Sequence, residues 1–405
     1  MKKNIVYGLS LGLAFTAIGF SCAKKSDDAA SASRKLYIAT GLCYSGTGFT
    51  APAVTDVGKI LSRLDVDTRQ YEVVRDYRNL ADEEPDTYPN GITDGGDGYV
   101  YVAVENATVT GARRIDKIAK AAFGTQVVWQ PNSAALAASA LRGVARAADN
   151  GVLVGNTVGV ERFDATPTRK EVDPGVSWGG GNAGLCANNN TRITDLVALP
   201  KAVAGDEIGK FIYAHSAAGQ MDIGVISKNG SNLAARCLAN APGGAALVEA
   251  ATADSSYDST LSANATPTSI VYIPTGGGTG KLLVAYSSSS TNGVGAGTLN
   301  NALVMYDFTE NTVAGESASL ANGTVLYNNT SYFFGVTAMA FDSTNNMLYV
   351  ASAESLAVAP TGYNIEKFSI DLTTPGATRV TDSDNSSFEE SNSFTNCITG
   401  MFVAD

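Results

Sequence analysis

Few residues of this chain could do acid–base or metal chemistry. His215, in the segment Ile212–Ser216, is the single histidine of the 405 residues, and no carboxylate adjoins it. General bases and metal ligands work together with partner groups of that kind. We therefore expect His215 to pack at the end of a strand, and the sequence predicts no catalytic residue and no metal ligand.

The segment Asp94–Gly98 superficially resembles a calcium-binding loop because it contains two aspartates and three glycines. A calcium loop of the EF-hand type needs oxygen ligands at alternating positions and a distal glutamate, which are missing here. Aspartate and glycine are also the residues that a tight hairpin turn selects. The segment is therefore predicted to be a turn.

Two glycine-rich stretches, 177–184 and 275–280, lack the Lys-Ser/Thr pair and the following helix of a phosphate-binding loop. The sequence also has no Gly-x-Ser-x-Gly elbow of the kind that carries a nucleophilic serine. No cofactor is expected.

The charge balance is acidic, with 39 Asp and Glu against 28 Lys and Arg and a net charge of -11. Nucleic-acid binding needs clustered basic side chains, so a nucleic-acid partner is not expected. The chain is poor in charged residues (17%) and contains 42 glycines, a composition that is typical of an exported β-protein rich in turns.

The N-terminus has the features of an export signal. A basic start, Met1–Lys3, precedes an apolar run that ends at Phe20 and is followed by Ser21 and Cys22. This segment resembles a bacterial lipoprotein signal, in which the cysteine is lipidated and becomes the mature N-terminus. The alternative is ordinary cleavage beside a stray cysteine.

These features divide the chain into a signal peptide (1–21), a flexible tether (22–35) and one β-domain (36–405). The lipid on Cys22 would make a membrane the first partner. The predicted location is the bacterial cell envelope, on the periplasmic or surface face of the outer membrane.

One hairpin pattern recurs along the β-domain: an apolar strand, a turn of Asp, Asn or Gly, and a second strand that ends in a small residue. Two more strands follow in most copies. The first strands lie near Ile92, Val144, Ile193, Ile270, Val336 and Ile398.

Four-stranded units at this spacing predict a six-bladed β-propeller of antiparallel blades. The wide gap between Ile193 and Ile270 leaves seven blades as an alternative.

The last copy is divided between the two ends of the chain. Residues 398–405 supply its first strand and residues 36–39 its second, which would close the ring and remove two free sheet edges. If Leu36 lies opposite Ala404, Cys43 faces Cys397.

The other two cysteines after the signal peptide, Cys186 and Cys237, would then form a second disulfide. Four unpaired thiols are the alternative, which is less common in exported proteins.

The segment from Tyr88 to Ala103 carries a family resemblance. It is similar to the hairpins of six-bladed propellers of the NHL, SMP-30 and TolB-like kind. The resemblance is architectural. SMP-30-type lactonases hold a central metal with a carboxylate and two Asn or Asp side chains; Asn90 matches one such position, and no companion carboxylate is found.

Ligand binding is expected on one face of the ring, where the long loops gather. Aromatic and arginine side chains on a rigid frame are common binding residues. Candidate binding residues on this face or near strand ends are Tyr44, Asn90, Arg142, Trp178, Arg192, His215, Tyr332, Phe333 and Tyr363.

The sequence thus predicts a membrane-tethered lipoprotein that acts as a binding or scaffolding propeller for another envelope protein or a small ligand. It favours a binding protein over an enzyme. The alternatives are a metal-dependent, lactonase-like hydrolase and a purely structural surface lipoprotein.

Overall fold

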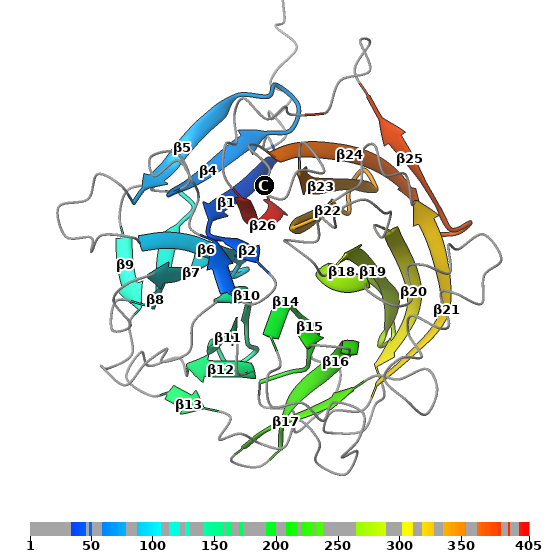
Figure 1. Cartoon of the computed structure of the whole chain (residues 1–405), viewed down its shortest axis with the longest axis horizontal. Helices are drawn as coiled ribbons and strands as arrows, with labels where there is room; N and C mark the ends of the chain where they lie inside the picture. Colours follow the sequence, from blue (N-terminus) through cyan, green and yellow to red (C-terminus); the bar gives the residue numbers. More distant parts are fainter. Residues whose placement is uncertain are drawn as a thin grey trace, which may run out of the picture.

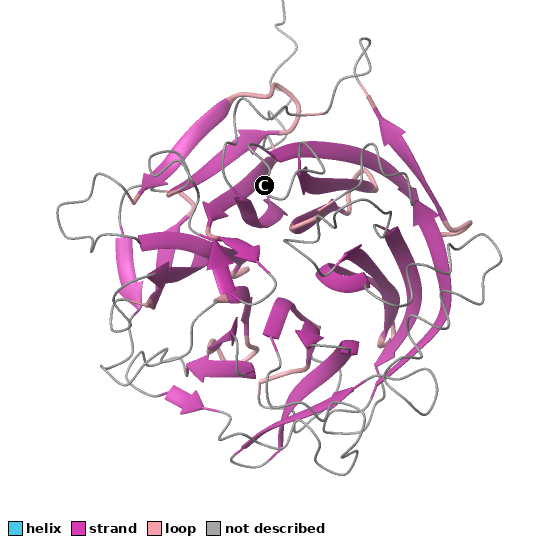
Figure 2. Cartoon of the chain, in the orientation of Figure 1, coloured by secondary structure: helices cyan, strands magenta, loops and turns pink. Residues whose placement is uncertain are grey.

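The computed structural model describes residues 34–45, 48–50, 59–77, 87–106, 113–121, 126–129, 141–156, 159–163, 170–172, 192–199, 208–217, 220–229, 232–237, 265–288, 302–310, 318–327, 335–353, 363–381, 388 and 397–404. The described part is all β, without a helix, and its strands form six four-stranded antiparallel sheets and one two-stranded hairpin (Figures 1 and 2).

The first sheet joins the two ends of the chain in the order β26 (Cys397–Ala404), β1 (Lys35–Gly41), β4 (Ile60–Asp65) and β5 (Tyr71–Asp76). The small hairpin pairs β2 (Cys43–Ser45) with β3 (Gly48–Thr50). The second sheet contains β6 (Thr87–Asp94), β7 (Tyr99–Asn106), β8 (Arg114–Ala119) and β9 (Gln126–Trp129). The third contains β10 (Arg142–Arg146), β11 (Val152–Asn156), β12 (Gly159–Phe163) and β13 (Lys170–Val172).

The fourth sheet contains β14 (Arg192–Ala198), β15 (Phe211–Ala217), β16 (Gln220–Asn229) and β17 (Asn232–Cys237). The fifth contains β18 (Ala265–Gly276), β19 (Thr279–Ser288), β20 (Ala302–Glu310) and β21 (Ala318–Tyr327). The sixth contains β22 (Ala338–Asp342), β23 (Met347–Ala353), β24 (Tyr363–Asp371) and β25 (Gly376–Val380).

The inner strand of each sheet contacts the inner strand of the next. These contacts join β26 to β6, β6 to β10, β10 to β14, β14 to β18, β18 to β22 and β22 back to β26. Figure 1 shows the sheets placed around a common centre, which gives the fold a propeller-like form. The predicted first strands at Ile92, Val144, Ile193, Ile270 and Ile398 lie in these inner strands, and Val336 lies two residues before β22.

Hydrophobic packing fills the spaces between successive sheets. The buried apolar residues of the described part form six clusters, each built from two neighbouring sheets. Strands such as β7 are buried on both faces, which explains its run of Val and Tyr residues.

Small residues occur where the sheets approach most closely. A Cβ on Gly155 would lie 2.2 Å from Ile193 Cγ2 of the next sheet, so the small residue that ends this second strand allows the two sheets to pack closely.

The predicted turn at Asp94–Gly98 is confirmed. Gly96 and Gly98 adopt positive φ angles (66° and 84°), which glycine tolerates best. Asp94 accepts a hydrogen bond from Gly96 N at 2.9 Å and pairs with Lys120 at 3.0 Å. The aspartate therefore serves the turn and an ion pair.

Pairing of the two chain ends is observed, but the predicted register is wrong. Lys35, not Leu36, lies opposite Ala404, and a bulge at the other end sets Gly41 opposite Cys397. Cys43 lies beyond this pair, in β2, opposite Thr50. The prediction is thus off by one residue along the regular part of the pairing, and the bulge between Ala39 and Thr40 adds a second residue that a count along regular strands cannot anticipate. Both predicted disulfide pairings stay predictions. The side chains of Cys43 and Cys237 lie outside the described part, and Cys186 lies outside it entirely.

Candidate functional site

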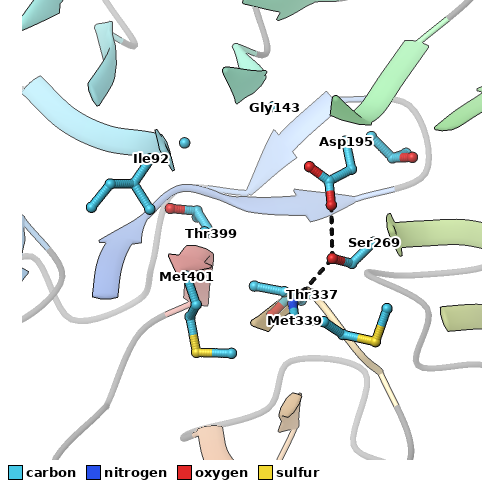
Figure 3. Close-up of a pocket in the computed structure, with 12 residues that line it drawn as sticks. Ile92, Gly143, Asp195, Ser269, Thr337, Met339, Thr399 and Met401 are labelled. Atoms are coloured by element: carbon cyan, nitrogen blue, oxygen red, sulfur yellow. Dashed lines mark hydrogen bonds between the residues drawn. The ribbon is translucent and has the colours of Figure 1, made fainter. Parts of the chain in front are cut away.

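A small cavity lies where the six inner strands converge (Figure 3). Its volume is about 30 Å³, which is room for about two water molecules. Small-molecule sites usually measure about 300 Å³ or more. The cavity is therefore a water- or ion-sized space.

Repeated β-bulges shape the walls of this cavity. Five of the six inner strands have one where they enter the sheet, and the bulged residues are Asn90, Gly143, Thr194, Thr268 and Thr399. A bulge leaves one residue out of the ladder and re-aims its side chain. Here it frees polar side chains to bond with neighbouring strands.

Threonine side chains link adjacent sheets. Thr399 Oγ1 lies 2.9 Å from the Pro89 carbonyl of the next sheet, and Thr194 Oγ1 donates to the Pro267 carbonyl at 2.6 Å. A third hydroxyl, Thr337 Oγ1, also belongs to a residue of the cavity wall; it is buried and has no partner among the described residues. A water in the cavity would satisfy it.

Asp195 is the one carboxylate among the residues that line the cavity. Its Oδ2 accepts hydrogen bonds from Ser269 Oγ (2.8 Å) and Ile270 N (2.9 Å), and its Oδ1 accepts one from Leu196 N (2.8 Å). Burial raises the pKa of Asp195, and these donors and the charge of Arg142 oppose the rise. The carboxylate thus joins β14 to β18.

Ser269 continues the chain of hydrogen bonds, because its Oγ accepts the Met339 amide at 3.0 Å (Figure 3). A nucleophilic serine needs a base that accepts its proton and a carbonyl site beside it. Ser269 instead donates to Asp195 and accepts from β22, so both sides of its hydroxyl are engaged in holding sheets together.

At one end of the inner strands, which we call the mouth, two side chains hold the backbone of Leu42. Asn90 Oδ1 accepts the Leu42 amide at 2.8 Å, and Arg142 Nη2 donates to the Leu42 carbonyl at 3.0 Å. Asn90 Nδ2 also donates to the Leu141 carbonyl at 2.9 Å. Both side chains and Leu42 are buried. A Cβ on Gly41 would lie 2.4 Å from Asn90 Oδ1, so only glycine fits there.

The buried guanidinium of Arg142 keeps its charge. Burial lowers the pKa of Arg142 to about 10, and the nearby Tyr363 and Asp195 act in the opposite direction. At neutral pH it therefore remains a cation. Its Nη1 also donates to the Thr399 carbonyl at 3.3 Å, so Arg142 bonds both Leu42 and β26.

The structure places the predicted binding residues as follows. Asn90 and Arg142 meet at Leu42, and buried Tyr363 lies next to β26, with its hydroxyl 2.8 Å from Cys397 Sγ. Burial raises the pKa of Tyr363.

For three of the remaining predicted residues the structure describes the strand position alone. Arg192 lies opposite Ser216, and His215 lies opposite Ile193. Tyr44 lies in β2. The side chains of these three residues lie outside the described part. Four further predicted residues lie outside it entirely: Trp178, Tyr332, Phe333 and Cys22.

Sequence reasoning missed Asp195, Ser269 and Thr399. A signal was present: Ile193-Thr-Asp195, Val336-Thr-Ala338 and Ile398-Thr-Gly400 share an apolar residue followed by threonine at the start of the inner strand. Aligning the repeats on this threonine would have indicated a repeated polar position at the centre.

Two further features are missing from the described residues. These residues contain no cluster of three or more His, Cys, Asp or Glu side chains that could hold a metal ion. They also contain no helix of the length and hydropathy that crossing a membrane requires.

Comparison with known proteins gives only distant similarities. No family model matches the chain, and no curated protein matches its sequence. Solved structures match at low scores. A protein from Bacteroides fragilis, proposed to be a 6-phosphogluconolactonase, is 11% identical with a TM-score of 0.46, over 94% of this chain and 100% of that one. A gluconolactonase from Xanthomonas campestris is 12% identical with a TM-score of 0.39, over 74% and 81%.

A third match is the extracellular domain of a proposed one-component system from B. thetaiotaomicron, 11% identical with a TM-score of 0.43 over 90% of this chain. This chain spans only 36% of that one. Scores this low support no inference about what the chain binds or catalyses.

Proposed function

We propose that the chain is an exported lipoprotein whose six sheets form a closed six-bladed β-propeller, and that it works as a binding or scaffolding module of the bacterial envelope. Its partner would be another envelope protein or a small ligand, held by the outer faces and not by the centre of the ring. The run of contacts between inner strands, which returns from β22 to β26 and β6, supports the closed ring.

The observation that carries this proposal is the hydrogen-bonded Leu42 peptide at the mouth. Asn90, the residue that could be matched to a lactonase metal ligand, has its amide oxygen and nitrogen engaged by Leu42 and Leu141. The cavity behind it holds about 30 Å³ and is lined by a single carboxylate, Asp195. A metal-dependent hydrolase needs several ligands and an open position for substrate, and this centre favours a structural role.

The experiment that tests the scaffold against the hydrolase uses glucono-δ-lactone as substrate, with Ca²⁺, Mg²⁺, Mn²⁺ or Zn²⁺ added to the purified protein. We expect hydrolysis at the rate of the buffer alone for the wild type and for Asp195→Asn. A metal-dependent acceleration by the wild type that Asp195→Asn loses would favour the lactonase-like alternative instead.

Lipid attachment at Cys22 gives a second prediction. Cys22→Ala should move the protein from the membrane pellet to the soluble fraction, because the acyl chains are the proposed anchor. Ser21→Ala is the matched control, since it keeps a small residue before the cysteine and should stay in the pellet. An unchanged membrane fraction for Cys22→Ala would contradict the lipid anchor.

A further inference from the structure

The exposed apolar side chains of the described part lie together on one outer strand. Among the residues whose side chains the structure describes, Tyr71 (40% exposed) and Val73 (46% exposed) are the only large apolar residues that are exposed. Their strand, β5, is the last of its sheet and lies at the outer rim of the ring (Figure 1). Alternate residues of a strand point to the same side, so the two side chains form one apolar patch, which we call the β5 patch.

The chain enters the β-domain next to the β5 patch, at the end of the strands opposite the mouth. Arg34, the residue before β1, pairs with Asp67 of the β4–β5 turn at 3.3 Å. One residue further along β1, Leu36 lies opposite Leu64, and Leu64 lies opposite Tyr71. Two strand spacings are about 10 Å, so the start of the β-domain and the β5 patch are close neighbours.

The proposed lipid anchor would hold this rim close to a bilayer. Cys22 precedes Arg34 by 12 residues, and a segment of that length spans at most about 40 Å. A flexible tether of such a length keeps a surface near its target at an effective concentration on the order of millimolar. A contact that is too weak to bind a membrane by itself is then sufficient.

The charges around the β5 patch favour anionic headgroups. Arg69 and Lys367 lie over the ring of Phe388, at 4.9 and 5.3 Å from its centroid, in the hydrophobic cluster that also contains Leu36 and Leu64. Lys367 makes no ion pair among the described residues. Anionic lipids attract basic side chains near a membrane surface. Three carboxylates of the β4–β5 hairpin each pair with a lysine or an arginine: Asp65, Asp67 and Glu72.

We propose that the β5 patch rests on the bilayer that holds the Cys22 lipid. The ring of Tyr71 lies at the level of the headgroups with Val73 beside it, because a tyrosine has an apolar body and a polar tip and is enriched at membrane interfaces. Arg69 and Lys367 face the anionic headgroups. The inference deepens the proposed function and rests on its lipid anchor. It places the mouth on the side of the ring that is turned away from the membrane.

Quenching of a tryptophan by brominated lipids tests this contact. The protein is extracted from membranes, the mass of the lipid on Cys22 is measured, and the protein is reconstituted into phosphatidylethanolamine–phosphatidylglycerol vesicles with or without bromine on the acyl chains. Bromine should lower the fluorescence of Tyr71→Trp at least twofold, after subtraction of the signal of the unsubstituted protein, which contains Trp129 and Trp178. Ser319→Trp, at an exposed position near the start of the outer strand β21, is the matched control and should keep its fluorescence.

A second pair of variants tests the patch at its other residue, with Tyr71→Trp as the probe. Val73→Asp puts a charge into the contact and should lower the quenching to that of Ser319→Trp, whereas Val73→Ile should keep it. Both substitutions lie at an exposed position of an outer strand, so folding should persist.

The outcomes separate the contact from the anchor. A lipidated protein in which Tyr71→Trp is quenched no more than Ser319→Trp, or in which Val73→Asp changes nothing, overturns the contact and leaves the lipid anchor standing. A Cys22 without acyl groups overturns the anchor, and the contact with it.

Discussion

A chain that ends after Asn396 is expected not to fold cooperatively. The deletion removes β26, whose Ile398 and Met401 are buried in the cluster that joins the first and last sheets. Burial of one such side chain contributes about 1.5–3 kcal/mol. These two alone contribute about 3–6 kcal/mol, which is comparable to the total stability of many domains, about 5–15 kcal/mol.

The deletion also uncovers β1, which pairs with β26 along its whole length, and an exposed edge of this kind invites aggregation. Thermal unfolding followed by circular dichroism in the β-sheet region checks the prediction. Removal of Asp405 alone, which lies beyond β26, is the control and should leave the transition unchanged. A truncated protein with the cooperative transition of the full chain would show that β26 is dispensable.

Asn90→Ala is expected to lower the free energy of unfolding by about 2–6 kcal/mol. The substitution leaves the Leu42 amide and the Leu141 carbonyl buried without their partner, and each such group costs about 1–3 kcal/mol. Denaturant unfolding of the two proteins measures the difference.

Asn345→Ala is the matched control for this measurement. Asn345 Nδ2 donates to Asp342 Oδ2 at 3.2 Å from an exposed turn, where water replaces the lost bond. Its cost should stay below about 0.5 kcal/mol, as for most surface substitutions. Equal effects of the two substitutions would mean that the Asn90 bridge contributes nothing to holding the mouth.

The sequence predicted the strands and their order well, for a physical reason. Hairpins are local: the turn glycines of Asp94–Gly98 and the β-branched and aromatic strands on either side of them lie within 20 residues, 87–106, so a short window contains the whole signal. The pairing of the two chain ends could be predicted because the last copy is incomplete without residues 36–39. Its register could not, because the turn residues of a hairpin, which fix the register of local pairs, are missing between the two chain ends. The further shift at Thr399 comes with a bond from the threonine hydroxyl to the Pro89 carbonyl of the neighbouring β6.

The centre of the molecule was predicted less well. Asn90 and Arg142 were singled out for their position at strand starts, but nothing local indicates that both would bond the backbone of Leu42, 48 and 100 residues away. Asp195 looked like an ordinary strand residue, because its partners Ser269 and Ile270 lie on the next sheet. Contacts between sheets depend on the closed arrangement of all the inner strands, and a repeat pattern read along the chain does not contain them.

Hydrogen exchange at the Leu42 amide tests most directly whether the mouth is closed. The proposed function requires this amide to remain bonded to Asn90 Oδ1. Its exchange should then be as slow as that of Ile38, which lies buried in β1 between two paired strands. Exchange as fast as that of an exposed turn amide such as Asn345 would mean that the mouth opens freely, and would contradict a scaffold with a closed centre.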